Sequence, residues 1–190
     1  MGVPINKLIC ASNENKVLFD FFRTGTYDKN REFVLTSSPS MDILISSNLE
    51  RLIYTIAGQD GQKNAELMDA LKSSGAYEIT KEMKAKLDDF VGGYATEEQT
   101  AQAIHDTYKR TGYVMDTHTA VASCVCAQYR EESGDETKCL IASTASPYKF
   151  VGSVMRAIDA EYAGRDEFEL VDELEKLSQV AVPNAVKGDP

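Results

Sequence analysis

The chain has 190 residues, enough for one hydrophobic core with an attached lobe. It is 43% hydrophobic and 26% charged, which is the balance of a globular protein rather than a disordered one. A formal net charge of -10 with no basic stripe argues against a nucleic-acid partner. The sequence has no run of about 20 apolar residues for a membrane span and no signal peptide, so a cytoplasmic protein is expected.

Short apolar runs alternate with amphipathic helical patterns along the whole chain. Extended segments are predicted at residues 5–11, 31–36, 77–80 and 137–142. Helices are predicted at about 13–24, 49–56, 62–73, 81–90, 96–110, 117–132, 147–158 and 166–178. Strands that alternate with helices in this way predict an α/β fold, with a mainly parallel sheet flanked by helices.

Capping signals and apolar stripes indicate where several helices begin and which face they bury. Ser47–Glu50 and Thr96–Gln99 both have the capping-box pattern. Ser146 before Pro147 predicts an N-cap with proline at the first helical position. The predicted inner faces consist of Val17, Leu18, Phe21 and Phe22; of Leu49, Leu52, Ile53 and Ile56; and of Val151, Val154, Met155 and Ile158.

Two stretches differ from this simple alternation. The helix within residues 112–132 is apolar nearly all round, which predicts burial against the sheet. Residues from about 60 to 95 are rich in helix and poor in strand patterns, so we expect a helix-rich lobe inserted at the edge of the sheet.

The four cysteines are Cys10, Cys124, Cys126 and Cys139. The C-x-C pair lies in a predicted helix, where residues two apart point to different faces, so its spacing does not suit zinc. Each cysteine has apolar neighbours in the sequence. We therefore expect reduced, buried, structural thiols and no metal site.

Polar side chains follow two of the predicted strands, at the sheet edge where open α/β folds bind ligands. "CASNEN" places Asn13 and Asn15 after the first strand, and "IASTASP" places Thr144 after the late one. A helix N-terminus at such a point favours a phosphate or a carboxylate. The simpler interpretation is that these residues cap helices, and residue types alone favour it.

The other candidates are more isolated. His118 lies in a turn ahead of the buried helix, where backbone groups usually satisfy a histidine. Lys149 follows the Ser-Pro turn and either reaches an anion or stays solvated, and Asp42 in its loop is equally ambiguous. Asn48 and Arg51 lie one helical turn apart, and their spacing fits two interpretations. Either they hold an anion together, or Arg51 pairs with a nearby carboxylate.

No complete catalytic set accompanies these groups. The sequence contains no Ser/His/Asp set, no metal-ligand spacing, no Walker loop and no G-x-G-x-x-G. The residues therefore predict half a site, with groups that hold a ligand and none that does chemistry.

Four blocks, in order across nearly the whole chain, resemble the C-terminal portion of threonine synthase. They are "NKLICASNENKVLFDFFRTGTYDKNRE", "SSPSMDILISSNLERLIY", "YVMDTHTAVA" and "CLIASTASPYKF". The resemblance implies part of the large domain of a fold type II, tryptophan-synthase-β-like enzyme that uses pyridoxal phosphate (PLP). It also implies conversion of O-phosphohomoserine and water to threonine and phosphate. Residues 1–160 would belong to the catalytic domain, and 161–190 would be an acidic helix and a truncated C-terminal segment.

Two motifs of that family are absent from this sequence. They are the Phe-Lys-Asp-type motif with the Schiff-base lysine and the Ser-Gly-Asn-Phe-Gly-type loop that cradles the cofactor phosphate. The resemblance therefore assigns no catalytic residue to this chain. It implies a truncated enzyme whose partner is its missing N-terminal half, and which alone is inactive and does not hold PLP.

The same resemblance assigns roles to residues. Thr144 in "STASP" is the candidate to bond the pyridine nitrogen of the cofactor. The family usually has histidine where this chain has Ser146, which puts a role for Ser146 in question. It usually has proline where this chain has Thr117, which puts a tight turn before His118 in question. The candidates for contact with substrate or phosphate are Asn13, Asn15, Ser38, Asp42, Asn48, Arg51, His118 and Lys149.

Two alternatives keep the fold and change the function. The chain is then a non-catalytic binding or regulatory module, or part of a PLP-dependent dehydratase. In each case a partial parallel sheet exposes strand edges, which predicts self-association or marginal stability.

Overall fold

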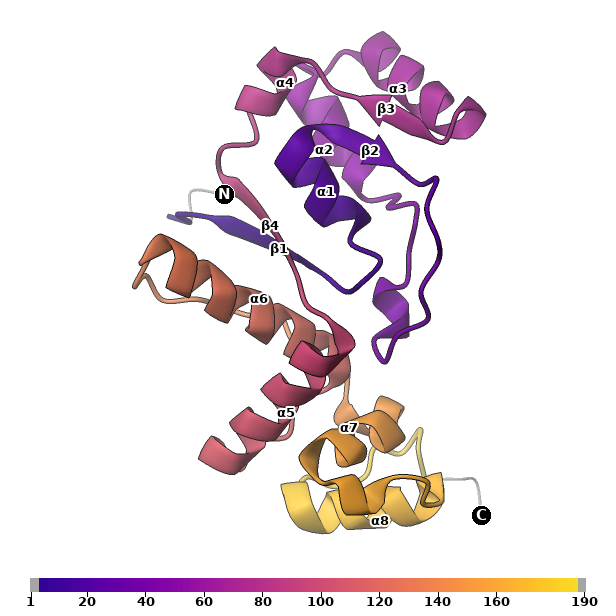
Figure 1. Ribbon diagram of the computed structural model, residues 1–190, viewed down its shortest axis with the longest axis vertical. Helices are drawn as coiled ribbons and strands as arrows, with labels where there is room; N and C mark the ends of the chain where they lie inside the picture. Colours follow the sequence, from indigo (N-terminus) through magenta and orange to yellow (C-terminus); the bar gives the residue numbers. More distant parts are fainter. Residues whose placement is uncertain (1–3, 188–190) are drawn as a thin grey trace.

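The computed structural model describes residues 4–187. Strands and helices alternate, so the α/β class predicted from the sequence is confirmed (Figure 1). In chain order the elements are β1 (Leu8–Ser12), α1 (Val17–Thr24), β2 (Thr26–Asp28), the 3-10 helix η1 (Pro39–Met41), α2 (Leu49–Ile56), α3 (Gly61–Ser73), β3 (Ala76–Glu78), α4 (Lys81–Ala85), β4 (Phe90–Tyr94), α5 (Glu97–Thr111), α6 (Thr117–Ser133), η2 (Pro147–Phe150), α7 (Val151–Ile158), η3 (Ala160–Tyr162) and α8 (Glu167–Ser178).

A parallel pair of strands, β1 and β4, lies near the middle of the molecule (Figure 1). Leu8 is opposite Phe90 and Ser12 is opposite Tyr94. Successive residues of a strand face opposite sides of the sheet, and glycines occupy both sides of β4. A Cβ on Gly92 would lie 3.2 Å from the Phe19 Cα of α1, and one on Gly93 would lie 2.4 Å from Val125 Cγ1 of α6. The glycines therefore let α1 and α6 approach the two faces of the sheet closely.

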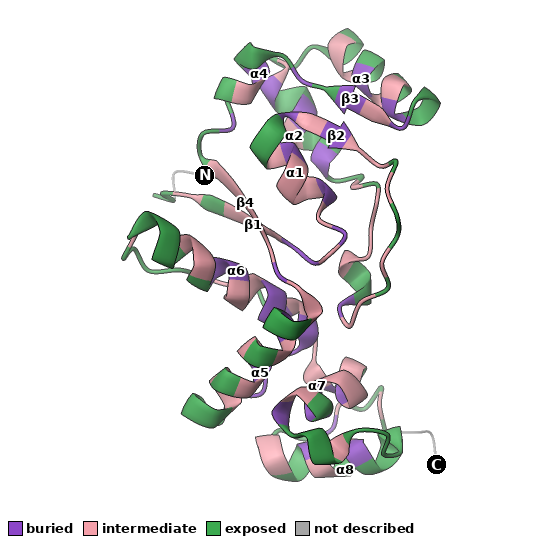
Figure 2. Ribbon diagram, in the orientation of Figure 1, coloured by how far each residue is buried: buried purple, intermediate pink, exposed green. Residues whose placement is uncertain are grey.

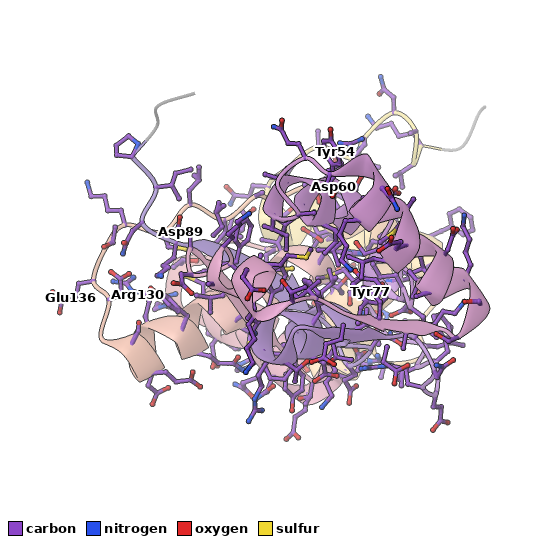
Figure 3. The ribbon with its side chains drawn as sticks, turned by 90° about the horizontal axis from the view of Figure 1, so that it is seen from above. Tyr54, Asp60, Tyr77, Asp89, Arg130 and Glu136 are labelled. Carbon is purple, nitrogen blue, oxygen red and sulfur yellow. The ribbon has the colours of Figure 1, made fainter. Side chains whose placement is uncertain are left out.

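A first hydrophobic core lies under α1, α2, α3 and α4 and the antiparallel pair β2–β3. Phe21 and Ile53 are fully buried in it, and the rings of Tyr27 and Tyr77 stack with centroids 5.3 Å apart. Figure 3 shows Tyr77 within the body of the molecule. The apolar stripes predicted for α1 and α2 both face this core.

A second hydrophobic core lies between α5, α7 and α8. Figure 2 shows buried stretches, in purple, on α7 and α8. Val154, Met155 and Leu174 are fully buried there. The four residues of the predicted α7 stripe are all buried, which confirms that prediction. The acidic residues of α8 lie mostly on its exposed side, as the amphipathic pattern indicated.

The segment at 31–36 was predicted to be a strand and is not one. Its backbone bonds to a side chain instead of a neighbouring strand. Asn15 accepts a hydrogen bond from Val34 N at 3.0 Å and donates one to Val34 O at 2.8 Å. A side-chain amide therefore substitutes for a strand partner here, and apolar periodicity carries no signal for that.

The strand predicted at 137–142 is also wrong, because this segment has no strand partner among residues 4–187. Leu140 is 97% exposed. The segment follows α6 and runs back along it. Apolar β-branched sequence makes such a stretch suitable for a sheet, but a parallel strand forms only where a neighbour is available.

The helix-rich lobe expected at about 60–95 contains α3 and α4, together with two strands. β4 at the end of this stretch is half of the central parallel sheet, and its "VGGY" sequence gave too little apolar signal to predict a strand. The prediction of a capping box at Thr96 and Gln99 is confirmed. The one predicted at Ser47–Glu50 is wrong, since Asn48 is the N-cap of α2 and its side chain caps nothing.

The four thiols are free, but not all are buried. Cys126 is buried, Cys10 and Cys124 are half-buried, and Cys139 is exposed. The expectation of buried structural thiols is therefore wrong for Cys139. Within residues 4–187, no group of three or more His, Cys, Asp or Glu side chains could hold a metal ion, and no helix has the length and apolarity of a membrane span.

Candidate functional site

A buried polar network lies where β1 ends. Asn13 and Asn15 follow β1 directly and are almost completely buried. The Asn13 side-chain amide donates to Asp42 Oδ1 at 2.7 Å and lies 3.1 Å from Ser38 Oγ. Asn15 Nδ2 lies 3.1 Å from the same carboxylate oxygen. The structure thus brings together four residues that the sequence pointed to separately: Asn13, Asn15, Ser38 and Asp42.

The Asp42 carboxylate is the centre of this network. Besides the two asparagine amides, it accepts the backbone N–H of Thr36 at 3.0 Å and the Thr36 hydroxyl at 2.7 Å. Buried polar groups need such partners, because leaving one unsatisfied costs about 1–3 kcal/mol. The network fixes the loop from residue 36 to 42 against the end of β1.

The same loop contacts the N-termini of two helices. Ser37 donates from its backbone N–H and its hydroxyl to Glu97 in the first turn of α5, at 2.9 and 3.1 Å. Ser40 N donates to His118 Nε2 at 3.1 Å, and His118 is the second residue of α6. The loop is therefore held at three points, by β1, α5 and α6.

His118 is held in one tautomer by these bonds. Its Nε2 accepts the Ser40 N–H, so the ring proton lies on Nδ1, 3.2 Å from Asp116 Oδ1. Asp116 is buried and caps α6 by accepting the backbone N–H groups of His118 and Thr119. The ring also packs on Phe150, with centroids 4.9 Å apart. His118 is thus a hydrogen-bonded connector between the loop, α6 and η2.

Thr144 lies beside this group on the segment before η2. Its neighbour Ser143 has its hydroxyl oxygen 2.9 Å from Thr119 Oγ1 of α6. Thr144 itself is exposed, and its side chain makes no hydrogen bond within residues 4–187. Lys149 is also exposed, with Nζ 5.3 Å from the Phe150 ring centroid. The surface beside the network therefore presents an exposed hydroxyl and an exposed cation.

Asn48 and Arg51 do not join this group. Both lie at the start of α2, which packs against α3, and both are exposed. Residue types alone did not indicate several groups that hold the network. They are Thr36, Ser37, Ser40, Glu97, Asp116, Thr119, Ser143 and Phe150. Of these, Asp116 had a detectable signal, an N-cap before a helix; the others depend on tertiary contacts.

Two hollows lie near these residues. A cleft of about 270 Å³ runs along β4 on the side away from β1, between Phe19, Gly93, Gln99 and Tyr129. A smaller cavity of about 150 Å³ lies behind Ser37 and Glu97, against α7. The cleft lies beside the outer edge of β4, where no strand pairs with β4 within residues 4–187.

The family model described as "Threonine synthase, C-terminal" matches residues 119–186, from α6 to the second core. The threonine synthase of yeast superposes with a TM-score of 0.81 at 31% identity, over 95% of this chain and 39% of that chain. The PLP-bound threonine synthase of Brucella melitensis superposes with a TM-score of 0.78 at 35% identity, over 95% of this chain and 37% of that chain.

The chain is therefore similar in sequence and structure to the C-terminal region of threonine synthases. The threonine synthase-like 1 protein of Pongo abelii is also similar, 44% identical over 160 residues, which are 83% of this chain and 21% of that protein. The chain spans about a fifth of that relative and less than two fifths of the two threonine synthases.

Proposed function

We propose that this chain forms the C-terminal part of a threonine synthase that uses PLP to convert O-phosphohomoserine and water to threonine and phosphate. The observation that carries the proposal is the superposition on PLP-bound threonine synthase over 95% of the chain at 35% identity. The chain would form one wall of the active site.

The described residues fit one side of the cofactor. Thr144 has an exposed hydroxyl with no partner within residues 4–187, so it is available to bond the pyridine nitrogen. Bound PLP supplies the electron sink for the reaction, and the protein tunes it. A neutral hydroxyl stabilises a proton on the ring nitrogen less than a carboxylate would. Thr144 would therefore orient the ring without holding it fully protonated.

The buried network would act by positioning. The side chains of Asn13, Asn15 and Asp42 are already bonded to one another, so their proposed role is to hold the loop from residue 36 to 42. Through Ser40 this loop fixes His118, which stays the candidate for contact with substrate. Lys149 is exposed five residues after Thr144 and would attract the substrate phosphate. Ser38, Asn48 and Arg51 remain candidates for substrate contact.

Two functions of the family need groups that this sequence lacks. The lysine motif and the glycine-rich phosphate loop are both absent from it. We therefore propose that this chain alone does not catalyse the reaction and does not hold PLP. An N-terminal region of the enzyme would supply both, and the cleft along the open edge of β4 is where it would continue the sheet.

A chimera tests the proposal. The matched region of yeast threonine synthase is replaced by this chain, and the chimera is expressed in a yeast strain without threonine synthase. Growth without threonine is expected, and so is phosphate release from O-phosphohomoserine by the purified chimera. Thr144→Val should lower turnover by about 10- to 100-fold, since it removes one hydrogen bond worth about 1.5–3 kcal/mol in a closed site. Its thermal stability should not change, because Thr144 is exposed.

The purified chimera also distinguishes the alternatives. Deamination of serine or threonine in place of phosphate release would favour a dehydratase. A folded chimera that binds PLP and has no activity on any of the three substrates would favour a non-catalytic module. Turnover of O-phosphohomoserine by this chain alone would contradict the proposed dependence on an N-terminal region.

A further inference from the structure

The buried Asp116 carboxylate does more than cap α6. Its Oδ1 accepts the backbone N–H groups of His118 at 2.8 Å and Thr119 at 3.2 Å, as an N-cap residue does. Its Oδ2 accepts the Thr119 hydroxyl. The Asp116 side chain is 0% exposed, so these donors take the place of water. Capping therefore explains the contacts of one carboxylate oxygen but not those of the other.

The Thr119 hydroxyl connects this carboxylate to the segment that carries Thr144. It donates to Asp116 Oδ2, and its oxygen lies 2.9 Å from Ser143 Oγ. A hydroxyl has one donor and two acceptor positions, so a single threonine can bond to both neighbours at once. Ser143 directly precedes Thr144 in the chain. A fixed Ser143 therefore restricts where the Thr144 hydroxyl can lie.

The turn with Thr144 is also held at its far end, again by the first turn of α6. The Phe150 ring packs on His118, with ring centroids 4.9 Å apart. His118 Nδ1 lies 3.2 Å from Asp116 Oδ1, and its Nε2 accepts the Ser40 N–H at 3.1 Å. One buried carboxylate is thus connected to both ends of this turn and, through Ser40, to the loop that follows β1.

We propose that Asp116 is a positioning residue, which holds Thr144 toward the pyridine nitrogen of PLP through the two hydroxyls that lie between them. The inference rests on the proposed function, because it gives Asp116 a role toward the same cofactor. Asp116 is too deeply buried to touch a ligand, so it acts only through the residues that it holds. Its bond to His118 keeps the loop around Ser40 in register with the same turn.

Holding Thr144 in place would strengthen its bond to the cofactor. Thr144 is exposed and its side chain makes no hydrogen bond within residues 4–187, so only its neighbours fix it. A mobile group loses conformational freedom when it binds, whereas an anchored one has lost part of that freedom during folding. Release of the anchor should therefore weaken PLP binding by about three- to tenfold, although no group that touches PLP is changed.

Two substitutions of Thr119 form a matched pair for the whole chain. Thr119→Val removes the hydroxyl with little change of shape and keeps the backbone bond to Asp116, whereas Thr119→Ser keeps the hydroxyl. Backbone order parameters from NMR relaxation report the freedom of Ser143 and Thr144. We expect values of about 0.8 in the unaltered chain and in Thr119→Ser, and values below about 0.6 in Thr119→Val.

Ser143→Ala distinguishes a lost anchor from damage to α6. Ser143 is exposed and lies outside the helix, so its removal leaves the bonds of Asp116 to α6 intact and the thermal stability nearly unchanged. The order parameter of Thr144 should nevertheless fall as far as with valine at position 119. Ser73→Ala is the matched control, because Ser73 is exposed too and its hydroxyl bonds to the backbone of its own helix α3. It should leave Thr144 unchanged.

The chimera with yeast threonine synthase tests the effect on the cofactor. Thr119→Val and Ser143→Ala should each weaken PLP binding by about three- to tenfold in a fluorescence titration, and Thr119→Ser should restore it. An unaltered chimera that neither binds PLP nor turns over O-phosphohomoserine would contradict the proposed function, while the order parameters of this chain still decide whether Asp116 holds Thr144. The positioning role is overturned if Thr144 is already mobile in the unaltered chain, if Ser143→Ala does not release it, or if valine and serine at position 119 bind PLP equally well in an active chimera.

Discussion

At Asp42 one carboxylate satisfies the buried amides of Asn13 and Asn15 and both donors of Thr36. Asp42→Ala removes the acceptor and leaves Asn13 Nδ2 with weaker partners in a buried site. We expect the variant to lose about 2–4 kcal/mol of unfolding free energy, measured by urea denaturation. The loop around Ser40 should also become mobile, so that amide exchange there increases.

A matched substitution separates this effect from simple loss of charge. Asp69 forms an exposed pair with Lys72 at 3.6 Å, and both side chains are mostly solvated. Asp69→Ala should change the unfolding free energy by less than about 0.5 kcal/mol. Equal losses for the two variants would show that the Asp42 network is not a stabilising unit.

Asp135 gives a pH-dependent contact between α6 and the segment after it. Hydrogen bonds from Thr137, then one from Tyr129, lower the pKa of Asp135 to about 2. A carboxyl group that is more acidic in the folded state stabilises that state above its ordinary pKa near 4, and this stabilisation is lost as the pH falls from about 4 to about 2. Amide exchange of Thr137, followed by NMR, should show protection that disappears over that range.

Tyr129 reports on the same contact from the other side. The hydrogen bond to Asp135 is the main cause that raises the pKa of Tyr129 above 10. In the Asp135→Asn variant, an NMR titration should therefore return the Tyr129 pKa towards 10. An unchanged value would mean that the two side chains do not form this bond in solution.

Among the secondary-structure elements, β4 depends on its two glycines. A Cβ on Gly93 would lie 2.4 Å from Val125 Cγ1, so alanine there requires α6 to move from the sheet. We expect Gly93→Ala to cost about 2–3 kcal/mol of unfolding free energy. Gly152→Ala in α7 is the control, because its nearest contact is Glu167 Oε1 at 3.6 Å and helical alanine is favoured over glycine.

A second substitution tests the reason for that cost. Val125→Ala removes the methyl groups that a Gly93 side chain would meet, so the double variant should recover at least about 1 kcal/mol relative to the sum of the single changes. Purely additive losses would contradict a clash between β4 and α6.

Sequence patterns predicted the helices better than the strands, and particular residues explain why. The apolar stripes of α2 and α7 were predicted correctly, because local periodicity decides which face of a helix is buried. The strand at 31–36 was predicted wrongly because the Asn15 side chain takes the place of a partner strand. β4 was missed because Gly92 and Gly93, which its packing requires, weaken the apolar pattern.

The candidate site shows the same division. Asn13, Asn15, Ser38, Asp42 and His118 were indicated by the sequence, and the structure brings them to one end of β1. Their use of each other as hydrogen-bond partners was not predictable, because it depends on how a loop 25 residues away in the chain returns to the strand. Whether any of them contacts a substrate stays a prediction.

On the scale of the whole molecule, two separate cores are joined through the parallel pair and α6. The first core is made of buried residues between Val17 and Leu87, and the second of buried residues between Ile104 and Val182. The polar network lies between them, since its loop contacts β1 on one side and α5 and α6 on the other. A ligand that touches Thr144 and His118 would therefore bind at the junction of the two cores, a usual place for an active site.

The open edges of this molecule predict self-association. β4 has a cleft instead of a strand on its outer side, and the extended segment near Leu140 has no strand partner within residues 4–187. Leu140 is 97% exposed, so pairing along this segment buries an apolar side chain and satisfies free backbone groups together. Sedimentation velocity under reducing conditions should show a dimer or larger species whose fraction rises with concentration.

Leu140→Lys should weaken this association by at least about tenfold, because it places a charge on the edge that pairs. Phe168→Lys is the matched control, since Phe168 is 77% exposed on α8, a helix that is not part of the sheet. It should leave the association unchanged. A monomer at every concentration, or an equal effect of the two lysines, would mean that the open edges are not the surface by which this chain associates.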